Sequence, residues 1–337
     1  MSCTDKFDTR PTVKKRKLNK LPPNPEKPDS SKAVGPGRFP SWLHRKLPKG
    51  GNLWKTDAVL EGQRLHTVCE EAKCPNLLEC WSKKTATFLI MGKECTRSCG
   101  FCDIDFSKNP QPLEEDEPQR VAESVRQLGL NHVVITMVAR DDIPDQGASH
   151  IAKVISEVRK TSPKSTIEIL TSDFSGQQDA LDVIIDAQPE IFNHNIETVR
   201  ELTPRVRHVA TYDRTLGVLD YVSRKKKGKT RFVKSGIMVG LGETEEQVKE
   251  TLGDLHHAGC NIVTMGQYLQ PNRQKLVVKE FVTPETFKSY ENYGKSIGIP
   301  YLFCGPFVRS SYNAGQVFQE VSDHESAIRR NPPSISS

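Results

Sequence analysis

Short apolar runs alternate with amphipathic stretches along most of the chain from residue 86 onward. Six of these runs are rich in β-branched or aromatic residues and end at turn residues. They predict β-strands at 86–91, 132–138, 166–170, 190–195, 232–240 and 262–268. The amphipathic stretches predict helices at 117–129, around 151–158, and at 177–187, 214–227, 244–258 and 284–298.

Two of these helices carry additional local signals. Around 151–158, apolar residues recur at the spacing of one buried helix face: Ile151, Val154, Ile155 and Val158. At 244–258, Thr244 is a candidate N-cap with Gln247 three residues later, and Gly259 follows the last turn.

A succession of six strand and helix units predicts an α/β fold with a parallel sheet, because each right-handed crossover returns the chain to the same end of the sheet. Two architectures fit this pattern. One is an open doubly wound sheet, and the other is a curved partial barrel. Periodicity alone does not choose between them, but in both the functional site lies at the carboxyl ends of the strands.

Composition narrows the class of protein. No run of 18 apolar residues is present, which predicts no membrane-spanning helix. The first ten residues lack the apolar core of a secretory signal, and Asp5 and Asp8 are atypical of a mitochondrial leader. We therefore expect a cytoplasmic protein that does not bind membranes.

The formal net charge of +6 is concentrated at the start of the chain. Residues 1–35 hold nine Lys and Arg against four acidic residues, so the remainder is nearly neutral. A nucleic-acid-binding surface needs a basic stripe on the folded domain, and none is expected here. Residues 1–37 are also rich in Pro, Ser, Lys and Gly, which is typical of a flexible tail.

Six of the nine cysteines lie between residues 69 and 102. In a cytoplasmic chain such crowding favours a metal or catalytic site over disulfides. Cys95, Cys99 and Cys102, spaced C-x3-C-x2-C, directly follow the first predicted strand. A structural zinc site needs four ligands, and no fourth lies nearby. Three cysteines suffice for a cluster of four irons and four sulfides, whose fourth iron then stays open. We favour the cluster and keep zinc as the alternative.

A second triplet, Cys69, Cys74 and Cys80, has the spacing C-x4-C-x5-C and again supplies three thiolates. Buried small side chains are the alternative, but three in twelve residues among Glu, Lys and Asn favour a second cluster. Its fourth ligand must come from elsewhere in the chain. We expect ordinary thiols at Cys3, Cys260 and Cys304.

The C-x3-C-x2-C loop, with Phe101 before its last cysteine, resembles the cysteine loop of the radical S-adenosylmethionine enzymes. The resemblance implies that the open iron binds S-adenosylmethionine and that an electron from the cluster cleaves it to a 5′-deoxyadenosyl radical. It also implies a partial (β/α)6 TIM-like barrel, which selects the curved architecture.

Further segments narrow the resemblance to the lipoyl synthase family over residues 38–320: "VCEEAKCPNLLECW", "RDDIPDQGA", "NHNIETV", "GIMVGLGET", "GQYLQPNR" and "CGPFVRSSYNAG". The family binds an auxiliary four-iron cluster through the C-x4-C-x5-C triplet and a serine of an R-S-S-Y motif. The matching residues here are Cys69, Cys74, Cys80 and, of the two serines, Ser311, with Ser310 as the alternative.

The resemblance implies insertion of two sulfur atoms at C6 and C8 of an octanoyl chain on a lysine of a carrier protein. Two S-adenosylmethionine molecules are used, and the auxiliary cluster supplies the sulfur. The implied partners are octanoylated lipoyl carrier domains (E2 subunits and the glycine cleavage H protein), an electron donor such as flavodoxin or ferredoxin, and an iron–sulfur carrier. The implied domains are a basic tail (1–37), an extension with the auxiliary cysteines (38–84), the barrel (85–300) and a C-terminal extension with R-S-S-Y and a flexible end (301–337).

Polar residues on or after the third and fourth strands are candidates to bind S-adenosylmethionine, as is "GIMVGLGE" in and after the fifth strand, which resembles the family's G-x-I-x-G-x-x-E element. The candidates are Glu168, Asn193, Asn195, Gly236, Gly240 and Glu243. His194 is a weaker candidate ligand, because the cysteines already satisfy both clusters. Ala139 and Gln146 stand where we associate an acid and a glycine with the family. Competing readings are a biotin synthase or methylthiotransferase, and a two-cluster electron carrier, for which six βα units are excess architecture.

Overall fold

The computed structural model describes residues 38–44, 52–82, 86–311 and 314–330. The expectations of a flexible tail over 1–37 and of an ordinary thiol at Cys3 lie outside the described residues. Residues 331–337 of the C-terminal extension (301–337), for which the sequence predicts a flexible end without fixing its boundary, also lie outside the described residues. Tyr312 of the R-S-S-Y motif lies outside them as well.

The centre of the molecule is a sheet in which strands follow one another in chain order. Its strands are β1 (His66–Thr67), β2 (Thr87–Ile90), β5 (His132–Met137), β6 (Thr166–Leu170), β7 (Ile191–Asn193), β8 (Phe232–Val239), β9 (Ile262–Gln267) and β10 (Tyr301–Gly305). β1 is antiparallel to β2, and the other pairs are parallel. A doubly wound sheet would reverse direction at a switch point, so this order confirms the partial barrel. Within the described residues the barrel stays open, with β1 and β10 at its edges.

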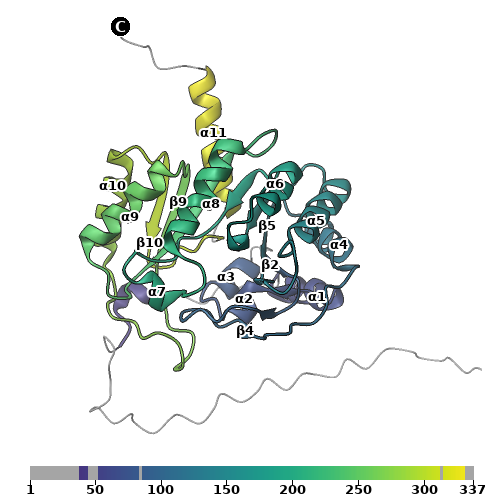
Figure 1. Ribbon diagram of the computed structural model, residues 1–337, viewed down its shortest axis with the longest axis horizontal. Helices are drawn as coiled ribbons and strands as arrows, with labels where there is room; N and C mark the ends of the chain where they lie inside the picture. Colours follow the sequence, from purple (N-terminus) through teal and green to yellow (C-terminus); the bar gives the residue numbers. More distant parts are fainter. Residues whose placement is uncertain (1–37, 45–51, 83–85, 312–313, 331–337) are drawn as a thin grey trace, which may run out of the picture.

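Helices cover the outer face of the sheet, as Figure 1 shows. They are α4 (Glu117–Leu128), α5 (Ala148–Thr161), α6 (Gln178–Ala187), α8 (Tyr212–Lys225), α9 (Glu245–His257) and α10 (Pro284–Ser296). The four apolar residues predicted to form one face of α5 are each at most 1% exposed. Thr244 and Gln247 form the predicted capping box of α9, and Gly259 has a φ of +78°. The main core lies between these helices and the sheet.

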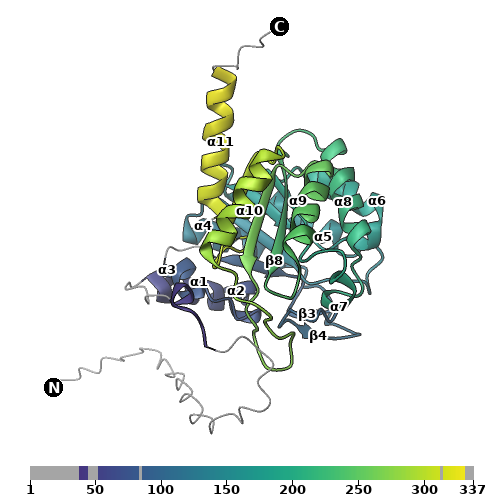
Figure 2. The ribbon, with the colours of Figure 1, turned by 90° about the vertical axis from the view of Figure 1, so that its left-hand side faces the viewer.

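Several elements were not predicted from the apolar pattern. At one end of the molecule lie α1 (Asn52–Gly62), α2 (Val68–Glu71), α3 (Leu77–Ser82) and the short pair β3 (Glu94–Cys95) and β4 (Asp105–Phe106) (Figure 2). Short helical turns occupy η2 (Ser41–Leu43), η3 (Phe174–Gly176) and α7 (Thr203–Val206). Of these, α2 and most of α3 lie in the segment "VCEEAKCPNLLECW", for which short helices are a possibility from the sequence. The 11 residues of α1 show no clear apolar period, and the remaining pieces are too short to show one.

The last helix, α11 (Ala314–Arg330), projects from the opposite end of the molecule (Figure 2). Its Val317 and Val321 pack against residues at the starts of β7, β8 and β9: Ile191, Phe232 and Ile262. The helix therefore covers the amino ends of these strands, and the carboxyl ends are left for the site. None of the described helices combines the length and the apolar composition that crossing a bilayer requires.

Candidate active site

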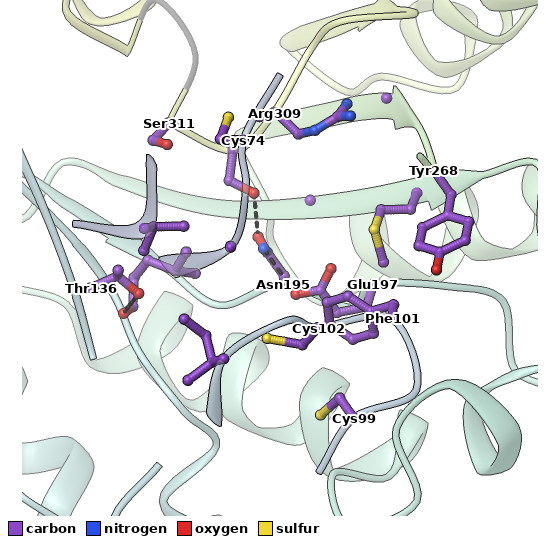
Figure 3. A pocket seen from close by; sticks show the side chains of 18 of the residues that line it. Cys74, Cys99, Phe101, Cys102, Thr136, Asn195, Glu197, Tyr268, Arg309 and Ser311 are labelled. Atoms are coloured by element: carbon purple, nitrogen blue, oxygen red, sulfur yellow. Dashed lines mark hydrogen bonds between the residues drawn. The ribbon is translucent and has the colours of Figure 1, made fainter. Parts of the chain in front are cut away.

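A cavity of about 660 Å³ opens at the carboxyl ends of the parallel strands. Of the predicted ligands, it is lined by Cys74, Cys95, Cys99, Cys102, Ser310 and Ser311. In the view of Figure 3, Cys74 and Ser311 lie on one side of Asn195, and Cys99 and Cys102 lie on the other. The fold thus brings residues from three distant parts of the sequence to one space.

The loop that carries Cys95, Cys99 and Cys102 is fixed by Arg97, which sequence reasoning missed. Its guanidinium donates to both carboxylate oxygens of Asp141 (Nη2 to Oδ1 2.6 Å, Nε to Oδ2 2.8 Å) and, from Nη1, to Oδ1 of Asp173 (2.7 Å). Burial alone would raise the pKa of Asp173, but the charge of Arg97 outweighs it and holds that pKa below its usual range. Arg97 therefore ties the loop to the segments that follow β5 and β6.

The thiols of this loop need a positive partner to become thiolates together. Burial is the main reason that the pKa of Cys99 rises to about 12 and that of Cys102 to about 11, and the neighbouring thiols raise both further. An iron–sulfur cluster is bound by thiolates and supplies that positive charge. The backbone N–H of Arg97 also donates to Sγ of Cys95 (3.4 Å), which suits a charged sulfur. The donor set therefore fits a cluster.

A single metal ion makes a different demand on geometry. Among the described residues, no three His, Cys, Asp or Glu side chains are grouped so as to hold one ion. In a four-iron cluster each thiolate binds its own iron, so the three sulfurs do not have to converge on one point. None of the eight cysteines that the structure describes forms a disulfide.

The auxiliary cysteines lie in and next to two short helices of the extension. Cys69 lies in α2, is 6% exposed, and has its pKa raised to about 11 chiefly by burial, with the nearby Cys74 thiol adding to the rise. Cys80 lies in α3 and packs against the main core. Only Cys74 of this triplet lines the cavity, and Lys73 before it adopts a left-handed φ of +48°.

The segment that carries the candidate serines lies against the inner face of β8 and β9. A Cβ at Gly266 would lie 1.9 Å from the carbonyl oxygen of Val308, and one at Gly236 would lie 2.5 Å from Oγ of Ser310. Oγ of Ser310 donates to Oδ1 of Asn195 (2.8 Å), the dashed line of Figure 3. The hydroxyl of Ser311 has no hydrogen-bond partner among the described residues, so of the two serines it is the one free to bind a metal.

The six candidate contacts to S-adenosylmethionine fall into two groups. Asn195 and Gly236 line the cavity. The other four do not line it: Glu168, Asn193, Gly240 and Glu243. Glu168 and Asn193 are fully buried and bonded to each other (2.8 Å), and the Glu243 carboxylate accepts from the N–H groups of Gly240 and Leu241 and so holds its own loop. Binding of S-adenosylmethionine by these residues stays a prediction.

Two further polar side chains at the floor of the cavity were not singled out from the sequence. Glu197 follows β7 with a left-handed φ of +67°, and it accepts from Nδ2 of Asn195 (3.1 Å). Burial raises the pKa of Glu197 even though Arg207 lies nearby. Arg207 donates to the backbone carbonyl of Asn195 (2.8 Å). Glu197 belongs to the quoted segment "NHNIETV", whereas no local pattern marks Arg207.

His194 and Gln146 have structural explanations. Nδ1 of His194 lies 2.9 Å from the carbonyl of Thr171 and Nε2 lies 3.3 Å from Oγ1 of Thr215, so both ring nitrogens have protein partners. Burial lowers its pKa to about 4. Gln146 adopts a left-handed φ of +50°, which explains why a glycine suits this position.

Comparisons with known proteins place these features in context. The profile of the radical SAM superfamily matches residues 89–255, and that of the N-terminal domain of lipoyl synthase matches residues 9–74. A lipoyl synthase of Protochlamydia amoebophila is 66% identical over 94% of this chain and 97% of its own length. A lipoyl synthase of Chlamydia felis is 50% identical over 94% of this chain and its full length.

Solved structures agree at the level of the fold. A crystal structure of methylornithine synthase has a TM-score of 0.50 and 16% identity, covering 64% of this chain and 63% of that one. The structure of Streptococcus suis SuiB bound to precursor peptide SuiA has a TM-score of 0.51 and 11% identity, covering 80% of this chain and 55% of that one.

Proposed function

Because this chain belongs to the lipoyl synthase family of radical S-adenosylmethionine enzymes, we propose that the cavity at the carboxyl ends of its strands is where both sulfur atoms are inserted. The enzyme inserts sulfur at C6 and C8 of an octanoyl chain carried on a lysine of a lipoyl carrier protein. Its cofactors are S-adenosylmethionine and two four-iron clusters. One observation carries the proposal: both cysteine loops and Ser311 reach the same cavity.

In this proposal Cys95, Cys99 and Cys102 hold the cluster that binds S-adenosylmethionine. The auxiliary cluster is held by four other residues: Cys69, Cys74, Cys80 and Ser311. When bound, these groups supply an electron, a 5′-deoxyadenosyl radical for each C–H bond, and the two sulfur atoms. A serine oxygen is a weaker iron ligand than a thiolate, so Ser311 suits a cluster that must release sulfur.

The chain itself orients the reactants. Arg97, paired with Asp141 and Asp173, fixes the cysteine loop and with it the place of the open iron. Asn195 and Glu197 give the floor of the cavity a polar patch suited to the amino and hydroxyl groups of S-adenosylmethionine. The remaining wall is largely apolar and suits an octanoyl chain; it includes Leu89, Met137, Leu170, Ile237 and Met238.

The finer assignments are part of the same proposal. The carrier proteins are E2 subunits and the glycine cleavage H protein, the electron donor is a protein such as flavodoxin or ferredoxin, and an iron–sulfur carrier is a further partner. Residues 38–84 and 301–337 serve as the two extensions that bind this cluster, and residues 85–300 as the barrel. Residence in the cytoplasm is supported by the six cysteines that must stay reduced to serve as ligands.

Anaerobic iron analysis tests the ligand assignment. Two four-iron clusters predict about eight irons per chain. Cys69→Ala and Cys99→Ala should each retain about four, and only Cys99→Ala should stop reductive cleavage of S-adenosylmethionine. Equal iron content in Cys69→Ala and the unmodified enzyme would contradict the auxiliary site.

A further inference from the structure

Lys234 is a charged residue inside an apolar strand. It lies in β8, and its side chain is 1% exposed. Its Nζ donates to both carboxylate oxygens of Glu168 (2.9 and 3.1 Å) and to the backbone carbonyl of Ser310 (2.5 Å). A buried ammonium is costly unless it is paired and fully hydrogen-bonded, so this arrangement calls for an explanation.

The charge of Lys234 is balanced by a set of groups beneath the cavity. Glu168 also accepts from Nδ2 of Asn193 (2.8 Å) and lies 3.6 Å from Nε2 of His132. Burial alone would raise the pKa of Glu168, but Lys234 and His132 hold it at about 2, so the carboxylate stays charged. Asn193 and His132 thus help Lys234 to fix the Glu168 carboxylate in place. The remaining hydrogen bond of the Lys234 ammonium goes to the Ser310 carbonyl.

Residues 307–310 need such a partner because they belong to no helix or strand. The segment is partly buried, and backbone carbonyls that are withdrawn from water outside regular structure need donors from elsewhere in the chain. The carbonyl of Phe307 accepts a hydrogen bond from Nδ2 of Asn76 (2.8 Å). Asn76 follows Cys74 by two positions and is 1% exposed. The carbonyl of Ser310 accepts a hydrogen bond from Nζ of Lys234. The segment is therefore held at one end by the cysteine-bearing extension and at the other by the barrel.

Two glycines of β8 and β9, Gly236 and Gly266, leave room for residues 308–310 to lie against the sheet. Any side chain at Gly236 or Gly266 would overlap Ser310 or Val308. The segment thus lies in direct contact with β8 and β9, and Lys234 is hydrogen-bonded to it from inside the barrel. Ser311 follows at once, on the side of the cavity where Figure 3 shows Cys74.

We propose that Lys234 is a positioning residue: by holding the Ser310 carbonyl from inside the barrel, it places the Ser311 hydroxyl beside Cys74, where the auxiliary cluster is bound. This inference rests on the proposed role of Ser311. It assigns to a buried ion pair, far from either cysteine triplet in sequence, the task of completing the ligand set.

The test uses Lys234→Met and the double variant Lys234→Met/Glu168→Met. The double variant removes both charges, so it avoids leaving an unpaired buried carboxylate that could unfold the protein. Lys226→Met is the matched control. Lys226 also donates to a backbone carbonyl, that of Arg231, and to Asn261 (3.1 Å each), but these contacts lie at the amino ends of the strands.

Hydrogen exchange of the cluster-free protein is the first readout. The backbone amide of Val308, which donates to the carbonyl of Gly305, should exchange at least about tenfold faster in both Lys234 variants, because the segment opens more often when its charged hydrogen bond is lost; it should exchange at the original rate in Lys226→Met. Unchanged exchange in the double variant would overturn the proposal. So would equal acceleration in Lys226→Met.

Reconstitution is the second readout. Lys234→Met should bind about four irons in place of about eight while it still cleaves S-adenosylmethionine reductively, which a general loss of structure would not produce. Accelerated exchange combined with a full complement of irons would overturn Ser311 as a ligand, and with it the proposed function of this segment, while the Lys234 anchor itself would stand.

Discussion

A single methyl group at Gly266 should displace the serine segment from the barrel. The Cβ of alanine would lie 1.9 Å from the backbone carbonyl oxygen of Val308, whereas ordinary contact begins at 3.4 Å. The segment must therefore retreat by roughly 1.5 Å, a large shift for a ligand that has to meet an iron. This shift also disturbs the turn after β10, where the N–H of Val308 donates to the carbonyl of Gly305 (3.1 Å).

The expected loss of stability is modest. Overpacking of this kind costs about 1–3 kcal/mol, against a typical total of about 5–15 kcal/mol, so Gly266→Ala should remain folded at 25 °C. Each kcal/mol shifts Tm by about 2–4 °C in chains of 150–250 residues and by less in longer ones. The effect on the auxiliary cluster should be larger than the effect on stability: the iron content should fall by half, from about eight to about four per chain.

Gly253→Ala is the matched control. Gly253 lies in α9, and a Cβ there would meet nothing within 4 Å. Alanine should stabilise this helix by up to about 1 kcal/mol and leave both clusters in place. Calorimetry and anaerobic iron analysis of the two variants provide the comparison. If Gly266→Ala bound as much iron as Gly253→Ala, the segment would not carry the auxiliary ligand and the reasoning would be refuted.

Three further outcomes follow from the site. Arg97→Met should lower the free energy of unfolding by about 3–5 kcal/mol, because the buried Asp173 carboxylate loses its main partner. Chemical denaturation measures this free energy, and a decrease of less than about 1 kcal/mol would contradict the prediction. Lowering the pH from 6.5 to 4 should reduce the free energy of unfolding of the cluster-free protein by up to about 3 kcal/mol. The pKa of His194 is about 4 in the folded protein and 6.5 in the unfolded chain, so in this pH window the unfolded chain binds the proton and the folded protein does not. Urea titrations of His194→Gln should lack this contribution. Ser311→Ala should lose thiolated product while Ser310→Ala keeps part of it, as mass spectrometry of an octanoyl-lysine peptide would show, and the reverse order would assign the ligand to Ser310.

Local patterns in the sequence predicted most of the barrel. All six strands and the helices that follow them are present, because hydrophobic period and caps are properties of neighbouring residues. β10 was missed because "YLFCG" is short and half-exposed, and α11 because it packs on the ends of strands through few residues. The open barrel itself was chosen by resemblance, since periodicity fits two architectures.

The site could be predicted only where its chemistry is local. Cysteine spacing identified two groups of thiols, but nothing in the spacing places Cys74 in the lining of the cavity and Cys69 outside it. The contacts from Arg97 to Asp173 and from Lys234 to Ser310 each join residues 76 positions apart. Such pairs form only after the strands have paired in register and residues 308–310 have folded back against β8 and β9. The only advance signal was Lys234 itself, a charge inside an apolar strand.

The central claim is that one cavity brings together the group that cleaves S-adenosylmethionine and the cluster that gives up its sulfur. The most direct measurement is a single turnover of enzyme reconstituted with isotopically labelled sulfide, given an octanoyl-lysine peptide in unlabelled buffer, with the product read by mass spectrometry. The account predicts one lipoyl product per chain at most, with both sulfur atoms labelled. Unlabelled sulfur in the product, or the same labelled yield from Cys74→Ala, would contradict it.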